Sequence, residues 1–333
     1  MRVVVRVGHR VRASRRPRAG RFSFHVRLPA QDVSIRVTAV DARGHGASTV
    51  VAPVAGLPAG AAPRFAWGRR DGRLTRSLTR LVRRFPGTAA AYVENLATGS
   101  GASWNARARF PAASTVKLAI AVQVLRSLGH APAAGTRVAG LMDAMLIHSD
   151  NVAANELLTY VGGSTGVGAA LVTEMLHEVG LVDTEMFGGY IPGTKRPPGI
   201  PALVTSQPSF GLGKYTTAWD LARLLRYVYL AAGGNGPLAT RFASFTPAAA
   251  RYLLFELTHV DEPGRITRFL GSRMRVAHKA GWISTARHDN GIVFTRRGAI
   301  LVTVMTWNPA GVGVASDVLA GRVTRTALRL LRR

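Results

Sequence analysis

Ser114 and Lys117 are the two residues of this chain that are best suited to covalent chemistry. They precede an apolar run at 118–122, a pattern that predicts a helix start with both side chains on one face. A serine hydroxyl is a poor nucleophile at neutral pH unless a base lies beside it. A lysine can be that base where burial near a helix N-terminus lowers its pKa. The spacing alone also fits an ordinary helix start with a solvated lysine. Other residues are needed to distinguish a nucleophile and its base from that arrangement.

Two further polar groups follow in the chain. Ser149 and Asn151 flank Asp150 at the start of an expected helix, where a hydroxyl and an amide two residues apart can both face a cleft. Asp150 itself fits a structural acid at a helix N-terminus. Lys279 lies within an apolar strand, close to Gly281, so it offers a charge where a ligand can approach the backbone.

These groups, in this order, resemble the S-x-x-K, S-D-N and K-[TS]-G motifs of class A β-lactamases and penicillin-binding peptidases. The flanking patterns F-P-x-x-S-T-x-K at 110–117 and S-D-N-x-A-A-N-x-L-L at 149–158 are similar as well. The resemblance covers about residues 65–333. It implies an α/β (α+β) fold, with an antiparallel sheet flanked by helices and a helical subdomain.

The resemblance also implies roles for these residues. Ser114 would attack an amide or β-lactam carbonyl, Lys117 would take its proton, and Ser149 would pass a proton to the leaving nitrogen. Backbone N–H groups of Ser114 and Trp282 would form the oxyanion hole. Lys279 would attract the substrate carboxylate. The expected substrate-binding residues are Asn151, Lys279, Ala280, Gly281, Trp282 and Arg287.

The family's deacylating glutamate has no clear counterpart in this sequence. Alignment from Thr184 places Tyr190 at its position, and Glu185, the nearest acid, is out of register. Tyr190 also fits a loop anchor. Without a base that activates water, we expect an acyl-enzyme to form and persist.

Two other features depart from the family pattern. Ser114 and Ser149 are only 149 − 114 = 35 residues apart, which predicts a more open site than in familiar class A enzymes. Ala280 stands where the family has a hydroxyl, so Arg287 or His288 would have to compensate at the substrate carboxylate. His278 fits a core or rim histidine better than a catalytic one.

The composition is strongly basic, with 44 Lys and Arg against 17 Asp and Glu and a net charge of +27. This charge fits affinity for polyanions such as anionic wall polymers, or an arginine bias spread over solvated surfaces. No nucleic-acid motif accompanies it. The chain has no cysteine, which excludes disulfides, and its nine histidines lack metal-site spacing, so no metal or organic cofactor is expected.

The chain divides into a β-rich segment at 1–52, a Pro/Ala/Gly-rich linker at 53–65 and a large domain at 66–333. Alternating runs at 3–7, 21–28 and 33–40 resemble part of a bacterial immunoglobulin-like sandwich. The start lacks a signal peptide and no stretch is long enough to cross a membrane, so the protein is cytoplasmic or its recorded start lies inside a longer exported chain. We expect export.

Apolar periodicity predicts the elements of the large domain. We expect helices over 71–84 and 314–331, a hairpin over 89–96 and 102–105, strands over 274–283, 288–295 and 299–307, and helices over 115–257 interrupted by a Gly/Pro-rich loop at 187–210.

The sequence therefore predicts a serine hydrolase that uses an acyl-enzyme. Its substrate would be a β-lactam, as in a β-lactamase, or a peptidoglycan peptide, as in a D-alanyl-D-alanine carboxypeptidase. The alternative from another class is a catalytically weak cell-wall-binding protein.

Overall fold

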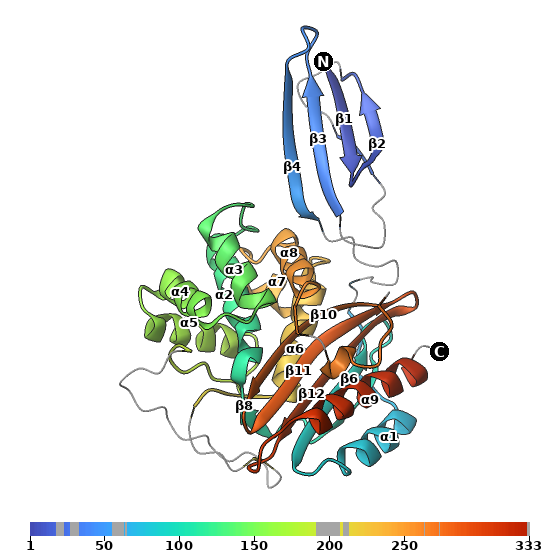
Figure 1. Cartoon of the computed structure of the whole chain (residues 1–333), viewed down its shortest axis with the longest axis vertical. Helices are drawn as coiled ribbons and strands as arrows, with labels where there is room; N and C mark the ends of the chain where they lie inside the picture. Colours follow the sequence, from blue (N-terminus) through green and yellow to red (C-terminus); the bar gives the residue numbers. More distant parts are fainter. Residues whose placement is uncertain are drawn as a thin grey trace. The chain divides into compact units, whose positions relative to one another are not determined.

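The computed structural model describes residues 1–17, 23–26, 33–54, 63, 65–190, 207–208, 213–262, 264–272 and 274–331. The chain forms two compact units, Met1–Ala59 and Gly60–Arg333 (Figure 1). Most of the linker expected over 53–65, and most of the loop expected over 187–210, lies outside the described residues.

The first unit contains a four-stranded antiparallel sheet in the order β2-β1-β3-β4. Its strands are β1 (Arg2–Val7), β2 (Arg10–Arg15), β3 (Val33–Val40) and β4 (Gly46–Val54). Val3, Val5 and Val7 are buried, as the alternation predicts for one face of a strand. The described residues of this unit form this single sheet, and the described part of the strand expected at 21–28 is not a strand. The immunoglobulin-like sandwich therefore stays a prediction.

The second unit is built on a six-stranded sheet in the order β10-β11-β12-β6-β7-β5. All neighbouring strands are antiparallel except β5 and β7, which run parallel. The strands are β5 (Arg69–Arg70), β6 (Thr88–Asn95), β7 (Ser100–Trp104), β10 (Arg275–Ile283), β11 (Ala286–Thr295) and β12 (Gly298–Trp307). The expected hairpin and the three C-terminal strands are confirmed, with ends that shift by at most two residues.

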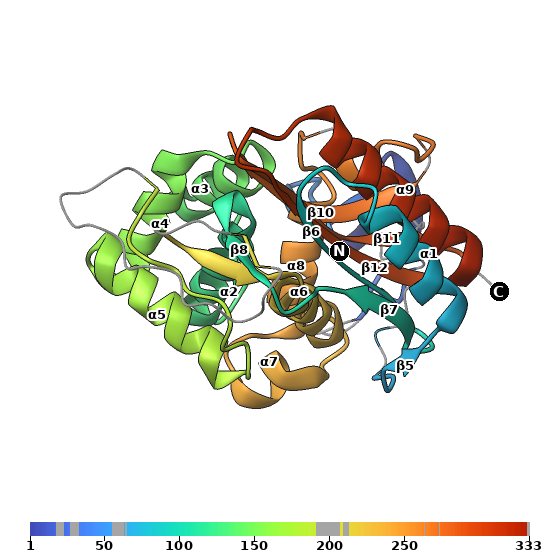
Figure 2. The same ribbon diagram turned by 90° about the horizontal axis from the view of Figure 1, so that it is seen from below.

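Helices α1 (Gly72–Val82) and α9 (Val314–Leu331) cover one face of this sheet (Figure 2). The apolar stripe Leu74, Leu78 and Val82 is buried in one core with side chains of β6, β12 and α9. Asp71 caps α1 by accepting a hydrogen bond from the Leu74 N–H at 2.8 Å. Both helices are where the periodicity predicts them.

The other face of the sheet contacts α6 and the helical subdomain. These helices are α2 (Lys117–Leu128), α3 (Arg137–Ile147), α4 (Asn151–Gly162), α5 (Thr165–Glu178), α6 (Ala218–Ala231), α7 (Gly236–Arg241) and α8 (Pro247–Leu257). Helix α2 contacts α3, α4, α5, α6 and α8, and its residues 117–125 are all buried. Strand β8 (Arg109–Pro111), which pairs with β9 (Tyr215–Thr217) in a short sheet, precedes the turn that leads into α2. None of the described helices is long and apolar enough to cross a membrane.

Candidate active site

Ser114 lies where the helical subdomain meets the edge strand of the sheet. It sits in a 3₁₀ turn, η1 (Ala113–Val116), directly before α2. A Cβ atom at Gly281 of β10 would lie only 2.7 Å from the backbone nitrogens of Ser114 and Thr115. The glycine is therefore required for the strand to approach the nucleophile so closely.

The backbone is strained beside the nucleophile and again at the second motif. Ala113 has a φ of 47° and Ser149 a φ of 58°, both in the left-handed region that non-glycine residues rarely adopt. Such conformations cost free energy and are enriched at functional sites. Among the described residues, the Ser114 side chain makes no hydrogen bond, which leaves its hydroxyl available for reaction.

Lys117 begins α2 and is completely buried. Its Nζ donates hydrogen bonds to the Ser149 carbonyl oxygen at 2.5 Å and to Asn151 Oδ1 at 2.8 Å. Burial, followed by the nearby charge of Lys279, lowers the pKa of Lys117 to about 7. A large fraction of Lys117 is thus neutral at physiological pH and able to accept a proton.

The Ser149 hydroxyl lies between the two site lysines. Lys279 Nζ is 3.1 Å from Ser149 Oγ, and Lys117 Nζ is 3.5 Å from it. Lys279 is 1% exposed. The next residue, Asp150, caps α4 by accepting from the Ala153 N–H at 2.6 Å, which confirms its structural role. The structure thus brings together Lys117, Ser149, Asn151 and Lys279, which come from three separate parts of the sequence.

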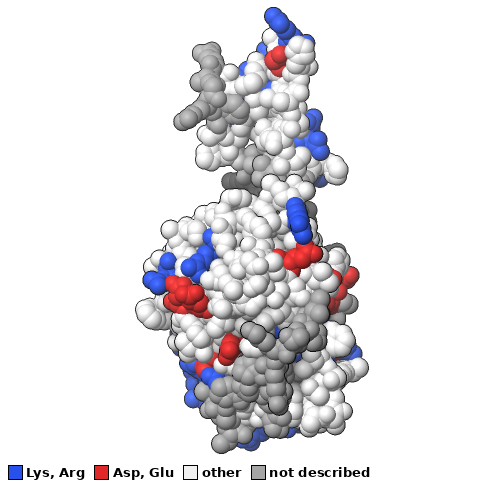
Figure 3. All heavy atoms as spheres, turned by 90° about the vertical axis from the view of Figure 1, so that its left-hand side faces the viewer, with Lys and Arg blue, Asp and Glu red and all other residues white. Residues whose placement is uncertain are grey.

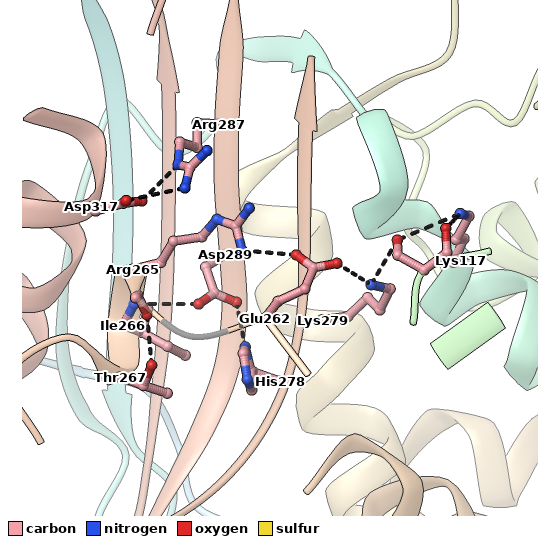
Figure 4. Close-up of polar contacts among 12 residues, drawn as sticks. Lys117, Glu262, Arg265, Ile266, Thr267, His278, Lys279, Arg287, Asp289 and Asp317 are labelled. Carbon is pink, nitrogen blue, oxygen red and sulfur yellow. Dashed lines mark hydrogen bonds and ion pairs between the residues drawn. The ribbon is translucent and has the colours of Figure 1, made fainter. Parts of the chain in front are cut away.

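A carboxylate joins this group from outside the three motifs. Glu262 Oε1 lies 3.4 Å from Lys279 Nζ, and Glu262 Oε2 accepts a hydrogen bond from Arg265 Nη1 at 2.8 Å (Figure 4). Burial alone would raise the pKa of Glu262, but the two cations lower it below its ordinary value. Glu262 is therefore ionised at neutral pH.

The strand register shows which side chains share the face of Lys279. In the β10–β11 pair, Gly281 lies opposite His288 and Trp282 lies opposite Arg287. Side chains alternate between the two faces of a sheet, so Arg287 lies on the face opposite to Lys279. There it forms an ion pair with Asp317 of α9, with N–O distances of 2.7 and 3.1 Å (Figure 4). This placement corrects the expectation that Arg287 compensates for Ala280.

His288 shares the face of Lys279 but does not replace the missing hydroxyl. It is buried, and its Nε2 lies 2.8 Å from the Pro111 carbonyl while Nδ1 accepts the N–H of Thr306 at 3.2 Å. Burial lowers the pKa of His288 to about 4. His288 is therefore neutral and ties the sheet to the residues just before Ser114.

His278 has the structural role that its position suggests. Its Nδ1 lies 3.0 Å from Asp289 Oδ1, and both side chains are buried. Burial alone would raise the pKa of Asp289. His278, Arg265 and the Ile266 N–H have the stronger, opposite effect, so the pKa lies below its ordinary value. This pair joins β10 to β11 behind the site.

Ala280 and Trp282 flank Gly281 on the opposite face of β10. Ala280 is fully buried, so it cannot contact a substrate with its side chain. Trp282 is 60% exposed, which leaves its ring available at the end of the strand instead of packed in a core. At Ala280, the backbone is therefore the part that can meet a ligand.

Tyr190 lies next to the nucleophile. Its hydroxyl donates to the Ala113 carbonyl at 3.1 Å, and its ring centroid is 4.5 Å from Lys117 Nζ and 4.7 Å from Lys214 Nζ. Burial raises the pKa of Tyr190, so the phenol stays protonated and cannot act as a base at neutral pH. The anchoring interpretation of Tyr190 fits these contacts.

Glu185, the other candidate for deacylation, lies in a different contact. Its backbone N–H donates to the Tyr215 carbonyl at 3.0 Å, and its carboxylate bonds the Tyr215 side chain. The next acids on either side of it in the sequence are engaged as well, Asp183 with Arg109 at 2.8 Å and Asp220 with the Asp183 N–H at 2.9 Å.

The whole segment between Glu185 and Asp220 contains no acidic residue. This holds for its entire sequence, including the part outside the described residues. The segment that contains Tyr190 therefore cannot supply a carboxylate to the site.

Sequence reasoning missed Glu262 and Lys214. Lys214 donates to the Gly189 carbonyl at 2.7 Å, and burial lowers its pKa. One signal was available for both: the chain has only four lysines, at 117, 195, 214 and 279, and only 17 acids. In a chain whose cations are almost all arginines, each lysine and each carboxylate is a candidate for a specific role.

Comparison with known proteins agrees with this geometry. The family model described as "Beta-lactamase enzyme family" matches residues 73–134 and 129–331. A β-lactamase of Streptomyces fradiae is 30% identical over 226 residues, which cover 57% of this chain and 71% of that protein. The structure of PBP-A is similar with a TM-score of 0.64 and 22% identity, covering 80% of this chain and 99% of the other.

A β-lactamase from Sphaerobacter thermophilus has a similar fold as well. Its TM-score is 0.58 at 22% identity, covering 76% of this chain and 95% of that chain. The sheet flanked by helices and the helical subdomain are thus the expected fold. The chain belongs to the beta-lactamase enzyme family and is a β-lactamase-like serine hydrolase that acts on amide bonds.

Proposed function

We propose that the protein is a penicillin-binding serine hydrolase that is acylated at Ser114 and deacylates slowly. The observation that supports this most is the combination of an available nucleophile and a neutral lysine with a loop that has no carboxylate. Lys117 has a lowered pKa and can accept a proton from Ser114. Tyr190 is protonated and Glu185 bonds Tyr215, so neither is placed to activate water for deacylation.

In the proposed reaction, neutral Lys117 removes the Ser114 proton as Oγ attacks the carbonyl carbon of a β-lactam or a peptide amide. Backbone N–H groups of Ser114 and Trp282 would stabilise the negative oxygen, and each such donor contributes roughly 3–4 kcal/mol. The C–N bond then breaks, and Ser149 passes a proton from Lys117 to the leaving nitrogen. The hydrogen bonds of Lys117 and Lys279 to Ser149 Oγ support this route.

A β-lactamase that deacylates quickly is the second candidate, and the relative from Streptomyces fradiae favours it. Such an enzyme would need a base that activates water. Among the described residues, Glu262 is the carboxylate that contacts a site lysine, and it is bound by both Lys279 and Arg265. It is therefore poorly placed to act as a free base.

A wall-binding role without catalysis is less well supported. On the face drawn in Figure 3, the basic side chains are scattered among uncharged ones rather than gathered in one patch. Several arginines are paired with acids, as Arg241 is with Glu178 at 2.8 Å and Arg137 with Glu156 at 2.7 Å. Because the proposed substrates occur outside the cytoplasm, the proposal includes an extracytoplasmic location.

The test is an intact-mass time course of the purified protein after penicillin G is added. The proposal predicts that the mass increases by one penicillin, that this adduct persists, and that Ser114→Ala never forms it. Consumption of the drug without a lasting adduct would favour the fast β-lactamase. If the protein neither forms an adduct nor consumes the drug, penicillin is not an acyl donor.

A further inference from the structure

Glu262 forms an ion pair with Lys279, the cation that the family resemblance assigns to the substrate carboxylate. Lys279 is almost fully buried, and its ammonium group contacts Ser149 Oγ at 3.1 Å and Glu262 Oε1 at 3.4 Å. The Glu262 side chain is 15% exposed and its second oxygen is bound by Arg265 at 2.8 Å. The carboxylate thus bridges two cations at the edge of the site (Figure 4).

Arg265 holds Glu262 in this position. The Arg265 side chain is 5% exposed, and its φ of 51° places its backbone in the left-handed region. Its Nε is buried without a hydrogen-bond partner among the described residues. An arginine that is buried and strained here, with one donor unsatisfied, costs free energy that its pairing with Glu262 helps to offset.

A substrate carboxylate that approaches Lys279 would meet this negative charge on the same ammonium group. Like charges a few ångströms apart repel each other strongly where the site is partly buried. We propose that Glu262 is a specificity-determining residue that competes with the substrate carboxylate for Lys279, and so weakens the preference of the site for anionic acyl donors. This inference rests on the proposed function of Ser114.

The test compares two acyl donors that differ by one charge, penicillin G and its methyl ester. The acylation rate of Ser114 by each is measured by intact mass at about pH 6, on the acidic side of neutrality, which favours the protonated form of Lys279. This pH is chosen because burial lowers the pKa of Lys279 and Glu262 opposes that shift. The ratio of the two acylation rates measures how strongly the site prefers the charged donor. A change that slows acylation by both donors equally leaves this ratio the same.

Glu262→Gln should raise the ratio of penicillin G to ester acylation by about tenfold, the effect of removing one unit charge near the substrate. Glu262→Asp keeps the charge and should leave the ratio close to that of the natural protein. An unchanged ratio in Glu262→Gln would overturn the inference, and so would an equal rise in Glu262→Asp. Equal loss of both rates would show that Glu262 only positions Lys279, which also overturns it.

Glu94→Gln is the matched control, because Glu94 is another buried carboxylate bound to an arginine, Arg226, at 2.7 Å. It should leave the ratio unchanged. A measurement on the natural protein needs no variant: acetate should barely slow acylation by the ester, because Glu262 already occupies Lys279. Strong, saturable slowing by millimolar acetate would overturn the inference even if Glu262→Gln failed to fold.

The design separates the two proposals. If neither compound acylates Ser114 in the natural protein, the proposed function fails and the inference fails with it. If both compounds acylate Ser114 and the ratio does not respond to Glu262→Gln, only the inference fails.

Discussion

The rate at which penicillin acylates Ser114 should follow the protonation of Lys117. Only neutral Lys117 can accept the serine proton. Burial and the charge of Lys279 lower the pKa of Lys117 to about 7. The neutral fraction is then about one tenth at pH 6 and about nine tenths at pH 8. The acylation rate should therefore rise about tenfold between these two values and level off above pH 8.

An ordinary lysine predicts a different curve. With a pKa of 10.5, less than about 1% of Lys117 would be neutral at pH 8, and the rate would rise about a hundredfold from pH 6 to pH 8 without levelling off. Rapid mixing with limiting penicillin G, followed by intact-mass detection at constant ionic strength, distinguishes the two curves. A logarithmic slope of one up to pH 9, with no plateau, would refute the lowered pKa of Lys117.

The cause of the shift can be tested separately. Lys279→Met removes the neighbouring positive charge, so the pKa of Lys117 should rise and the midpoint of the curve should move to higher pH. The midpoint is the informative quantity here, because the variant also loses attraction for the substrate carboxylate. A midpoint that stays in place would show that burial alone sets the pKa of Lys117.

Three further substitutions test the framework around the site. Gly281→Ala would place a Cβ 2.7 Å from the Ser114 nitrogen, so we expect at least a tenfold slower acylation and a folded protein by circular dichroism. Asp289→Asn removes the buried carboxylate that bonds His278 and the Ile266 N–H, and the free energy of unfolding at neutral pH should fall by about 1–3 kcal/mol in urea titrations. Since the pKa of Asp289 is lowered on folding, this difference should shrink as the pH falls below about 4, and a difference independent of pH would contradict the reasoning. Tyr190→Phe removes one hydrogen bond beside the nucleophile and should slow acylation severalfold, whereas an unchanged rate would mean that the phenol does not position the turn.

Much of the fold could be predicted because local pattern and tertiary packing agree. The stripe Leu74, Leu78 and Val82 has the helical period, and its buried face is the one that packs on the sheet. Helix α9 has the bounds that its amphipathic pattern predicts. The start of α2 differs from the expected regular helix, because Ser114 lies in a 3₁₀ turn and only Lys117 begins the α-helix.

The faces of the strands were harder to read from the sequence. Arg287 follows the turn after Ile283, and a shift of one residue in a hairpin moves a side chain to the other face. A tight connection at Ser284 and Thr285 would have predicted the pairing of Gly281 with His288, and hence Arg287 on the far face. The charge of Arg287 indicates a ligand for the substrate carboxylate, but charge alone does not determine on which face of the sheet the side chain lies.

Glu262 could not be found from spacing, because no periodic pattern links it to Lys279, 17 residues later. Their contact depends on the path of the chain from α8 around the edge strand β10. Only the folded structure brings this carboxylate to the lysine. The motif residues Lys117, Ser149 and Asn151, in contrast, lie at or just before the first residues of α2 and α4, and these two helices pack against each other.

The lifetime of the acyl-enzyme tests the central claim most directly. The protein is loaded with penicillin G, excess drug is removed, and the adduct mass is followed over time beside Tyr190→Glu, which places a carboxylate next to the nucleophile. The account predicts a long-lived adduct on Ser114 in the natural protein and faster loss of the adduct in Tyr190→Glu. An adduct that disappears from the natural protein as soon as free drug is removed would contradict it, because a deacylating base would then be present.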